Sequence, residues 1–223
     1  MGFVETFLNW DVMVRVLPML MRGIGNTIML AVTVLIFGSI LGVLLAIVRL
    51  YAPKPFNWMA VAWIDVFRAM PIPVLLILIY FALPYASVLL SPFLSVCFAL
   101  IFVFSSFTAE VVRAGIQAIP KGQTEAAEAL GVPFPVTIWK VILPQAMRIA
   151  IPPHTSNSVA IAKDTSLASL VAMPDLLKQA YDAQALTANP TPLIVAAAMY
   201  LIVLLPFVRL VSILENRYRR AER

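Results

Sequence analysis

The sequence predicts an all-α polytopic membrane protein, and three observations predict it together: composition, the length of the apolar runs and the placement of charges. Hydrophobic residues make up 62% of the 223 residues and charged residues only 12%, with a mean hydropathy of +0.95. A soluble domain could not cover that much apolar surface. The single cysteine, Cys97, lies in an apolar run, so we interpret it as a small buried hydrophobe and expect no disulfide within the chain.

Five transmembrane helices are expected, because five stretches approach the ~20 mostly apolar residues that a spanning helix needs. We assign them to a single transmembrane domain, residues 23–213, with spans near residues 26–48, 64–83, 92–112, 149–171 and 193–213. In the first span, Gly38 and Gly42 are spaced for close packing against a neighbouring helix.

Two regions mix charged residues with apolar ones. Residues 9–23 do so near the start of the chain, so we expect residues 1–25 to form an N-terminal segment whose helix lies in the membrane interface. In the second span, Arg68 would be costly at mid-bilayer. We therefore expect this helix to begin near Ile64, with Arg68 close to the interface and the crossing itself at residues 69–83.

The basic connections predict the orientation of the chain in the membrane. Lysine and arginine concentrate at residues 49–54, at residues 113–148 and in the C-terminal tail 214–223, which fall on one side if there are five spans. Since cytoplasmic loops carry the excess of basic residues, we predict the N-terminus outside and the C-terminus inside. Acidic residues near the start of the chain argue against a cleaved leader. We expect the arginines of the tail to anchor it to anionic headgroups: Arg217, Arg219, Arg220 and Arg223.

The connecting loop 114–148 is polar and alanine-rich, and its residues predict two short helices. Residues 123–130 are good helix formers, Gly131 is placed to close that helix in the left-handed conformation, and we expect a second helical stretch to end at Pro144. An ordinary solvated loop is the alternative, but a loop of this length with its own helices is usually functional. Three alanines have small side chains, so another protein could approach the helix backbone closely: Ala126, Ala127 and Ala129. Glu125 and Glu128 place negative charges at the edge of this surface.

The same loop resembles the EAA signature of the permease subunits of ABC importers. The matching pieces are Glu125-Ala126-Ala127, Gly131 and Val141–Pro144, with Val141 where the family has isoleucine. Further pieces resemble the polar amino acid branch of these permeases, which handles histidine, glutamate, glutamine, arginine, cystine or opines: Phe67–Pro71, Arg113–Ile116, Leu143–Ala146 and Lys163–Leu167. The resemblance implies the type I importer transmembrane fold. It also implies a coupling helix that docks on a cytoplasmic ATPase through Glu125, Ala126, Ala127, Leu130 and Gly131.

The resemblance also implies the partners of the chain in a bacterial inner membrane. They are a second permease subunit, identical or related, two cytoplasmic ATPase subunits and an extracytoplasmic solute-binding protein. The sequence contains no G-x-x-x-x-G-K-[ST] phosphate loop and no nucleophile-and-base set, so we expect no enzyme activity and no cofactor on this chain. ATP and Mg would then bind the partner subunit. No basic run is interleaved with aromatics, so we expect no nucleic acid partner.

The fourth span concentrates polar residues on one helical face. Ser156 and Lys163 share a face at i and i+7, as do Asn157 and Asp164. Charges in lipid are expensive, so Lys163 and Asp164 should face protein or a water-filled cavity, where an opposed pair would suit a zwitterion. The alternative is that the two residues pair with each other or cap a break in the helix. With the resemblance, we expect the substrate path at Ser156, Asn157, Lys163, Asp164, Thr165 and Ser166.

Other charged and polar residues have simpler interpretations. We expect Glu110 and Arg113 to form a local ion pair and His154 to bind no metal. Arg68 is either a positive anchor at the membrane surface or a structural brace beside a helix break, and we favour the brace. An ion-coupled secondary transporter of amino acids is the main alternative function, although such transporters usually show internal repeats and none is found in this sequence. A membrane scaffold that transports nothing would have no use for charges in the fourth span.

Overall fold

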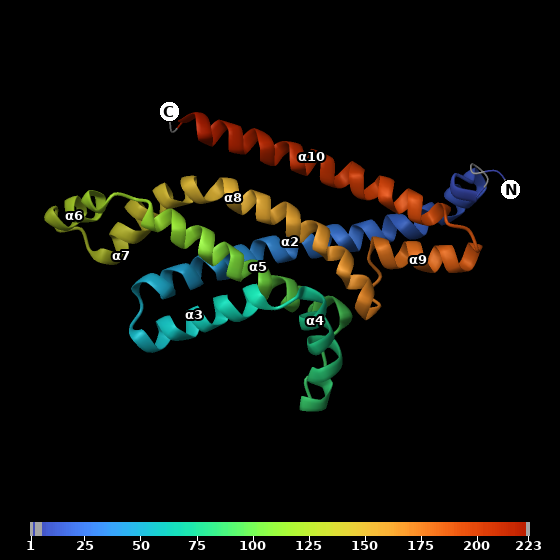
Figure 1. The fold of residues 1–223 in the computed structure, drawn as a ribbon, viewed down its shortest axis with the longest axis horizontal. Helices are drawn as coiled ribbons and strands as arrows, with labels where there is room; N and C mark the ends of the chain where they lie inside the picture. The colour runs from blue at the N-terminus through green and yellow to red at the C-terminus, as the bar shows by residue number, and fades with distance from the viewer. Residues whose placement is uncertain (1, 3–5, 222–223) are drawn as a thin grey trace. The chain divides into compact units, whose positions relative to one another are not determined.

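The chain is helical in the computed structural model, which describes residue 2 and residues 6–221 (Figure 1). The side chains of residues 212 and 214–221 and all of residues 222–223 are outside this description, so the arginine side chains of the expected tail are not described. The all-α prediction is confirmed. The main helices are α2 (Trp10–Tyr51), α3 (Lys54–Ala69), α4 (Ile72–Ile77), α5 (Pro92–Gln117), α6 (Lys121–Ala129), α7 (Phe134–Thr137), α8 (Leu143–Asp164), α9 (Leu176–Thr187) and α10 (Thr191–Ala221).

Four stretches within the described residues are long and apolar enough to cross a membrane. They are Trp10–Tyr51, Pro92–Gln117, Phe134–Val171 and Thr191–Val211. A fifth span exists if the bent pair Lys54–Ala69 and Ile72–Ala86 is one broken crossing. Four or five spans agree with a polytopic membrane protein, while the orientation of the termini stays a prediction.

Helix α2 differs from the predicted interfacial helix followed by a separate span. It runs unbroken from Trp10 to Tyr51, across residues 23–26, where the predicted interfacial helix was expected to end and the first span to begin. Gly23 serves packing instead, because a Cβ atom built there would lie 2.9 Å from the carbonyl oxygen of Asp175. A glycine inside a helix therefore marks a close approach to another segment.

The predicted helix over residues 64–83 is wrong as a continuous element. Helix α3 ends at Ala69, and Pro71 is extended with φ −62° and ψ 128° before α4 begins at Ile72. Proline lacks the N–H that would continue the helix and restricts the residue before it. The chain then continues through a π-helical turn, Leu78–Ala82, and a 3₁₀ turn, Leu83–Ala86.

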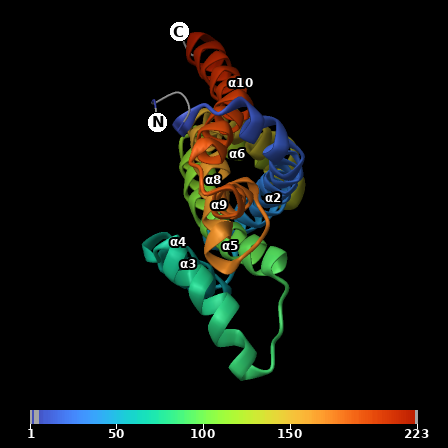
Figure 2. The same ribbon diagram turned by 90° about the vertical axis from the view of Figure 1, so that its right-hand side faces the viewer.

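The described chain divides into two compact units, of which the first comprises Met1–Ile36, Met70–Ile101 and Val159–Val208. Here α9 lies beside the N-terminal half of α2 (Figures 1 and 2). The core that joins them and the start of α10 consists of Val16, Leu20, Ile24, Leu176, Ala180, Ala183 and Ala196.

Helix α9 lies between the predicted fourth and fifth spans, and a buried carboxylate begins it. Asp175 accepts hydrogen bonds from the backbone N–H groups of Lys178 (2.9 Å) and Leu177 (3.3 Å), and the Tyr200 hydroxyl donates to it at 3.3 Å. Burial raises the pKa of the Asp175 carboxyl, and these donors oppose the shift. The sequence pattern that indicates this helix is an aspartate at the N-cap followed by helix-forming residues.

The second unit comprises Phe37–Ala69, Phe102–Ser158 and Arg209–Arg223. In it, the C-terminal halves of α2 and α5 pack closely, because Cβ atoms built on Gly38 and Gly42 would lie 2.7 Å from the Phe104 ring and 2.5 Å from Thr108 Cβ. The predicted packing role of both glycines is confirmed. The buried core beside this contact contains Ala46, Ile64, Ala109, Val112, Ile116, Ile138, Ile142, Leu143, Ala146 and Ala150.

Candidate functional site

The segment from α6 to α7 closes its first helix at Gly131. The Val132 N–H bonds the Ala127 carbonyl at 3.0 Å, and the Gly131 N–H bonds the Glu128 carbonyl at 2.9 Å. These two bonds form a Schellman motif, which needs a left-handed residue, and Gly131 has φ +70°. The predicted helix and its glycine cap are therefore confirmed.

Four of the five residues that were expected to dock on a partner are exposed on α6 and on the turn that follows it. Glu125, Ala126, Leu130 and Gly131 are exposed, and Leu130 is 82% exposed at the turn that follows the helix. Ala127 differs, since it is only 6% exposed and faces inward. Its small side chain lets α6 lie close to the protein, so direct contact with a partner through Ala127 is not expected.

The helical stretch after Gly131 does not end at Pro144, as was predicted. It begins at α7 and continues through a π-helical turn, Ile138–Ile142, directly into α8. A π turn widens the helix and leaves room for a proline that cannot donate a backbone hydrogen bond. The side-chain amide of Gln145 also donates to the Val141 carbonyl at 2.8 Å. The loop is therefore joined without a break to the following span.

Buried and aromatic contacts fasten the α6–α7 segment to the second unit. Ile138 and Ile142 enter the core described above, and the Phe134 ring meets Tyr51 edge to face at 5.3 Å between centroids. In Figure 1 both helices lie beyond the adjoining ends of α5 and α8. An apolar surface next to the alanines was not predicted. Four apolar residues of this polar loop are exposed and form it: Leu130, Phe134, Val136 and Trp139. Apolar residues close to the prolines of a polar loop are the sequence pattern that indicates such a surface.

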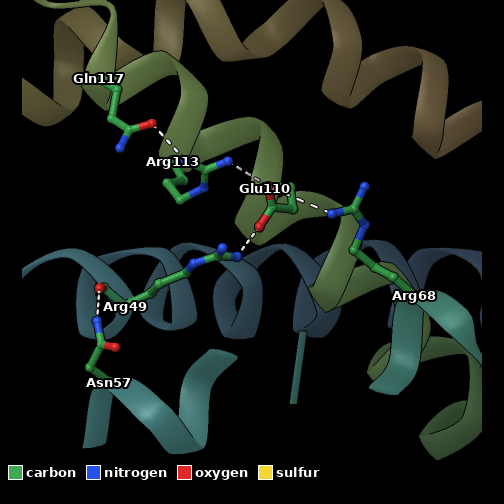
Figure 3. Close-up of polar contacts among 6 residues, drawn as sticks. All are labelled: Arg49, Asn57, Arg68, Glu110, Arg113 and Gln117. Carbon is green, nitrogen blue, oxygen red and sulfur yellow. Dashed lines mark hydrogen bonds and ion pairs between the residues drawn. The ribbon is translucent and has the colours of Figure 1, made fainter. Parts of the chain in front are cut away.

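A second group of polar residues surrounds Glu110 on α5 (Figure 3). Its Oε2 lies 2.8 Å from Arg113 Nη2 and 3.6 Å from Arg68 Nη1, and its Oε1 is paired with Arg49 Nη1. The Glu110 side chain is 17% exposed. Three helices of the second unit, α2, α3 and α5, therefore bring three guanidinium groups to one carboxylate.

Sequence reasoning found only part of this arginine cluster, which consists of Glu110, Arg49, Arg68 and Arg113. The ion pair between Glu110 and Arg113 was expected from their i, i+3 spacing. Arg49 was counted only as a basic loop residue, and no local pattern connects it with α5. Arg113 also donates to Gln117 Oε1 at 2.6 Å, and Asn57 donates to the Arg49 carbonyl.

The polar residues expected on the substrate path fall in both units. Lys163 is exposed, Asp164 and Ser166 are half-buried, and Thr165 is buried, all in the first unit. Ser156 is exposed and Asn157 half-buried in the second unit. Among the described residues, no ion pair joins Lys163 to Asp164, and the Asp164 side chain caps no helix end. Neither structural alternative considered for this charge pair is therefore observed.

His154 connects three helices of the second unit. Its Nε2 lies 3.1 Å from Ser39 Oγ on α2, and its Nδ1 lies 3.4 Å from Thr108 Oγ1 on α5. The ring also lies 5.3 Å from that of Phe104. No local pattern in the sequence indicates these contacts, because they depend on how α8 packs. The described residues contain no group of three His, Cys, Asp or Glu side chains that could hold a metal.

Comparison with known proteins assigns the family. Residues 38–220 match the model of the binding-protein-dependent transport system inner membrane component. The chain belongs to this family. Its relatives in Bacillus subtilis include the L-cystine transport system permease protein TcyB, 35% identical over 79% of this chain and 76% of the relative. The arginine transport system permease protein ArtQ is 32% identical over 89% of this chain and 91% of its own length.

Solved structures agree with this membership. A crystal structure of an amino acid ABC transporter with histidines superposes with a TM-score of 0.82, at 32% identity over 92% of this chain and 96% of that one. An inward-facing MetNI methionine ABC transporter is 21% identical with a TM-score of 0.72 over 90% of this chain and 96% of the other, which shows the shared fold alone. The chain is thus a multi-pass ABC permease of the polar amino acid branch, as the motifs led us to expect.

Proposed function

We propose that this chain is the permease subunit of an ABC importer that moves a polar amino acid across the bacterial inner membrane. Energy comes from ATP hydrolysis in a separate cytoplasmic subunit that docks at the α6–α7 segment. The observation that carries this proposal is the exposed helix α6, closed at Gly131 and flanked by exposed Leu130 and Phe134. Exposed apolar side chains around a short anchored helix favour a protein partner over an ordinary solvated loop.

The remaining parts of the importer follow from the family. Two permease subunits, identical or related, would enclose the path, with two ATPase subunits below and an extracytoplasmic solute-binding protein above. This chain would then have its N-terminus outside and its C-terminus inside, with ATP and Mg on the ATPase and no cofactor of its own. Relatives named for cystine, arginine and glutamine support a polar amino acid as the substrate class.

Helix continuity supports a mechanical role for the segment. From Phe134 to Val171 the backbone stays helical, through the π turn, α8 and a final 3₁₀ stretch, Thr165–Val171. Ile138 and Ile142 are buried near the start of this long helical element and hold it in the core. A displacement of α6 and α7 by a closing ATPase would therefore act on α8 directly, without a flexible connection to absorb it.

Uptake measurements with the assembled transporter test this function. The chain would be purified with its ATPase, reconstituted in liposomes and given the solute-binding protein with labelled cystine, arginine or glutamine. We expect uptake to require ATP hydrolysis and to persist when ionophores collapse ion gradients. Uptake that follows an ion gradient without ATP would overturn the proposal in favour of an ion-coupled secondary transporter.

Lys163 and Asp164 are proposed to line the substrate path in the assembled importer. Lys163 is exposed on a helix that is long and apolar enough to cross the membrane, and lipid is a costly surrounding for an ammonium group. A water-filled path shared with other subunits would remove that cost. A lysine next to an aspartate would also offer partners to both the carboxylate and the ammonium group of an amino acid.

Substituting these two residues tests the proposed path. Lys163→Ala and Asp164→Ala are each expected to lower transport by about tenfold, the effect of one lost charged contact of about 1.4 kcal/mol. The ATPase should still bind, because the α6–α7 segment is unchanged. Unchanged uptake kinetics in both variants would contradict the assignment. Lys178→Ala, on helix α9, provides a control with the same change of residue.

A further inference from the structure

The arginine cluster carries more positive charge than its single carboxylate can balance. Glu110 supplies one negative charge, against three guanidinium groups from Arg49, Arg68 and Arg113. The Nε atom of Arg113 is buried and has no hydrogen-bond partner within the described structure. Donors therefore outnumber acceptors in this cluster, and a net charge of about +2 remains at ordinary pH.

Arg68 contributes the donors that are directed outward. Its approach to Glu110, 3.6 Å, is too long for a hydrogen bond, and its side chain is 42% exposed. One terminal nitrogen faces Glu110 while the other points away from it (Figure 3). The Arg68 guanidinium also lies over the Phe107 ring, 5.6 Å from its centroid, which orients its plane.

Arg68 lies beside an exposed aromatic side chain. Phe107 on α5, over whose ring the Arg68 guanidinium lies, is itself exposed. Glu110 and Phe107 lie on a stretch of α5 that is long and apolar enough to cross a membrane. A cation above an exposed apolar surface offers one contact to an anionic headgroup and another to an acyl chain. Basic pockets between membrane helices bind anionic headgroups in this way.

We propose that the arginine cluster binds the phosphodiester of an anionic phospholipid, with Arg68 as the main ligand. The planar guanidinium fork matches two phosphate oxygens, and Arg49 and Arg113 add charge behind it. The acyl chains then lie against Phe107. The site requires only that α5 spans the membrane; under the orientation proposed above, the lipid belongs to the cytoplasmic leaflet.

Native mass spectrometry of the purified transporter in detergent tests this site. Titration with phosphatidylglycerol is expected to give tighter binding than titration with phosphatidylcholine, which carries no net charge. Arg68→Gln is expected to weaken phosphatidylglycerol binding by about fivefold, the effect of one basic residue near a membrane surface. Arg68→Lys keeps the charge and loses the planar guanidinium fork, so its affinity for phosphatidylglycerol should fall between those of the unaltered protein and Arg68→Gln.

Matched controls distinguish binding at Arg68 from a general effect of charge and from a loss of folding. Arg148→Gln removes an exposed arginine from the same unit and should leave phosphatidylglycerol binding unchanged. Arg68→Gln should melt in lipid-free detergent at the temperature of the unaltered protein, because its contact with Glu110 is the longest of the three. These results would support the site whether or not the chain transports an amino acid.

Several outcomes would overturn the lipid site. Equal weakening by Arg148→Gln would show a general charge effect. Displacement of phosphatidylglycerol by an equal concentration of inorganic phosphate would make the ligand a free anion. If Arg68→Gln leaves lipid binding unchanged but releases the second permease or the ATPase, the cluster binds a carboxylate of a partner protein instead.

Discussion

A Glu110→Ala variant is expected to be strongly destabilised, because three guanidinium groups would be left close together without a counter-charge. The Glu110 side chain is 17% exposed, and those of Arg49 and Arg113 are 22% and 27% exposed. Removing one partner from a buried ion pair costs about 3–5 kcal/mol. Since Arg68 is 42% exposed and better screened, we expect about 3 kcal/mol, the lower end of that range. Unfolding in detergent, followed by circular dichroism, measures the change.

Two further variants distinguish lost charge balance from lost packing. Glu128→Ala removes an exposed glutamate from α6 and should leave the stability of the chain almost unchanged. Adding Arg49→Met to Glu110→Ala should restore part of the stability, because one uncompensated charge leaves the cluster. Equal stability of Glu110→Ala and Glu128→Ala would refute the idea that Glu110 holds the three helices together.

Local chemistry explains which helices could be predicted. Helices α5 and α10 follow from apolar runs of the right length, and the end of α6 follows from a glycine that alone tolerates the left-handed conformation easily. Pro71 follows the end of α3, as proline chemistry predicts, although the residues around it form one apolar run. Pro144 does not end its helix, because the π turn before it accommodates the proline, and such a turn cannot be foreseen from residue type.

Other predictions failed because they depend on contacts between distant segments. The predicted interfacial helix covered residues 9–23, but at Gly23 helix α2 continues and meets the backbone of buried Asp175. Helix α9 is short and only partly apolar, so it needs its buried neighbours as much as its own propensity. In the arginine cluster, Glu110 and Arg113 are one turn apart, whereas Arg49 arrives from another helix. Only the close packing of α2 on α5, through Gly38 and Gly42, brings it there.

Coupled transport should fall sharply when Leu130 is replaced by aspartate. Leu130 is 82% exposed at the Gly131 turn, so its apolar side chain contributes little to the fold and is available to a partner. A buried apolar anchor in an interface is worth about 2 kcal/mol or more, and a charge in its place also has to be desolvated. We expect at least a roughly thirtyfold loss of ATPase binding, measured by co-purification and by the affinity of the reconstituted subunits.

The matched control for this variant is Leu186→Asp on α9. Leu186 is 80% exposed, so the substitution has the same chemistry and the same small effect on folding, at a site outside the α6–α7 segment. It should bind the ATPase as well as the unaltered chain does, whereas Leu130→Asp should insert normally and lose the ATPase. If both variants keep the ATPase, docking does not depend on the apolar surface beside Gly131. If both lose it, the added charge alone weakens ATPase binding, and the exposed side chains of α6 are not its docking surface.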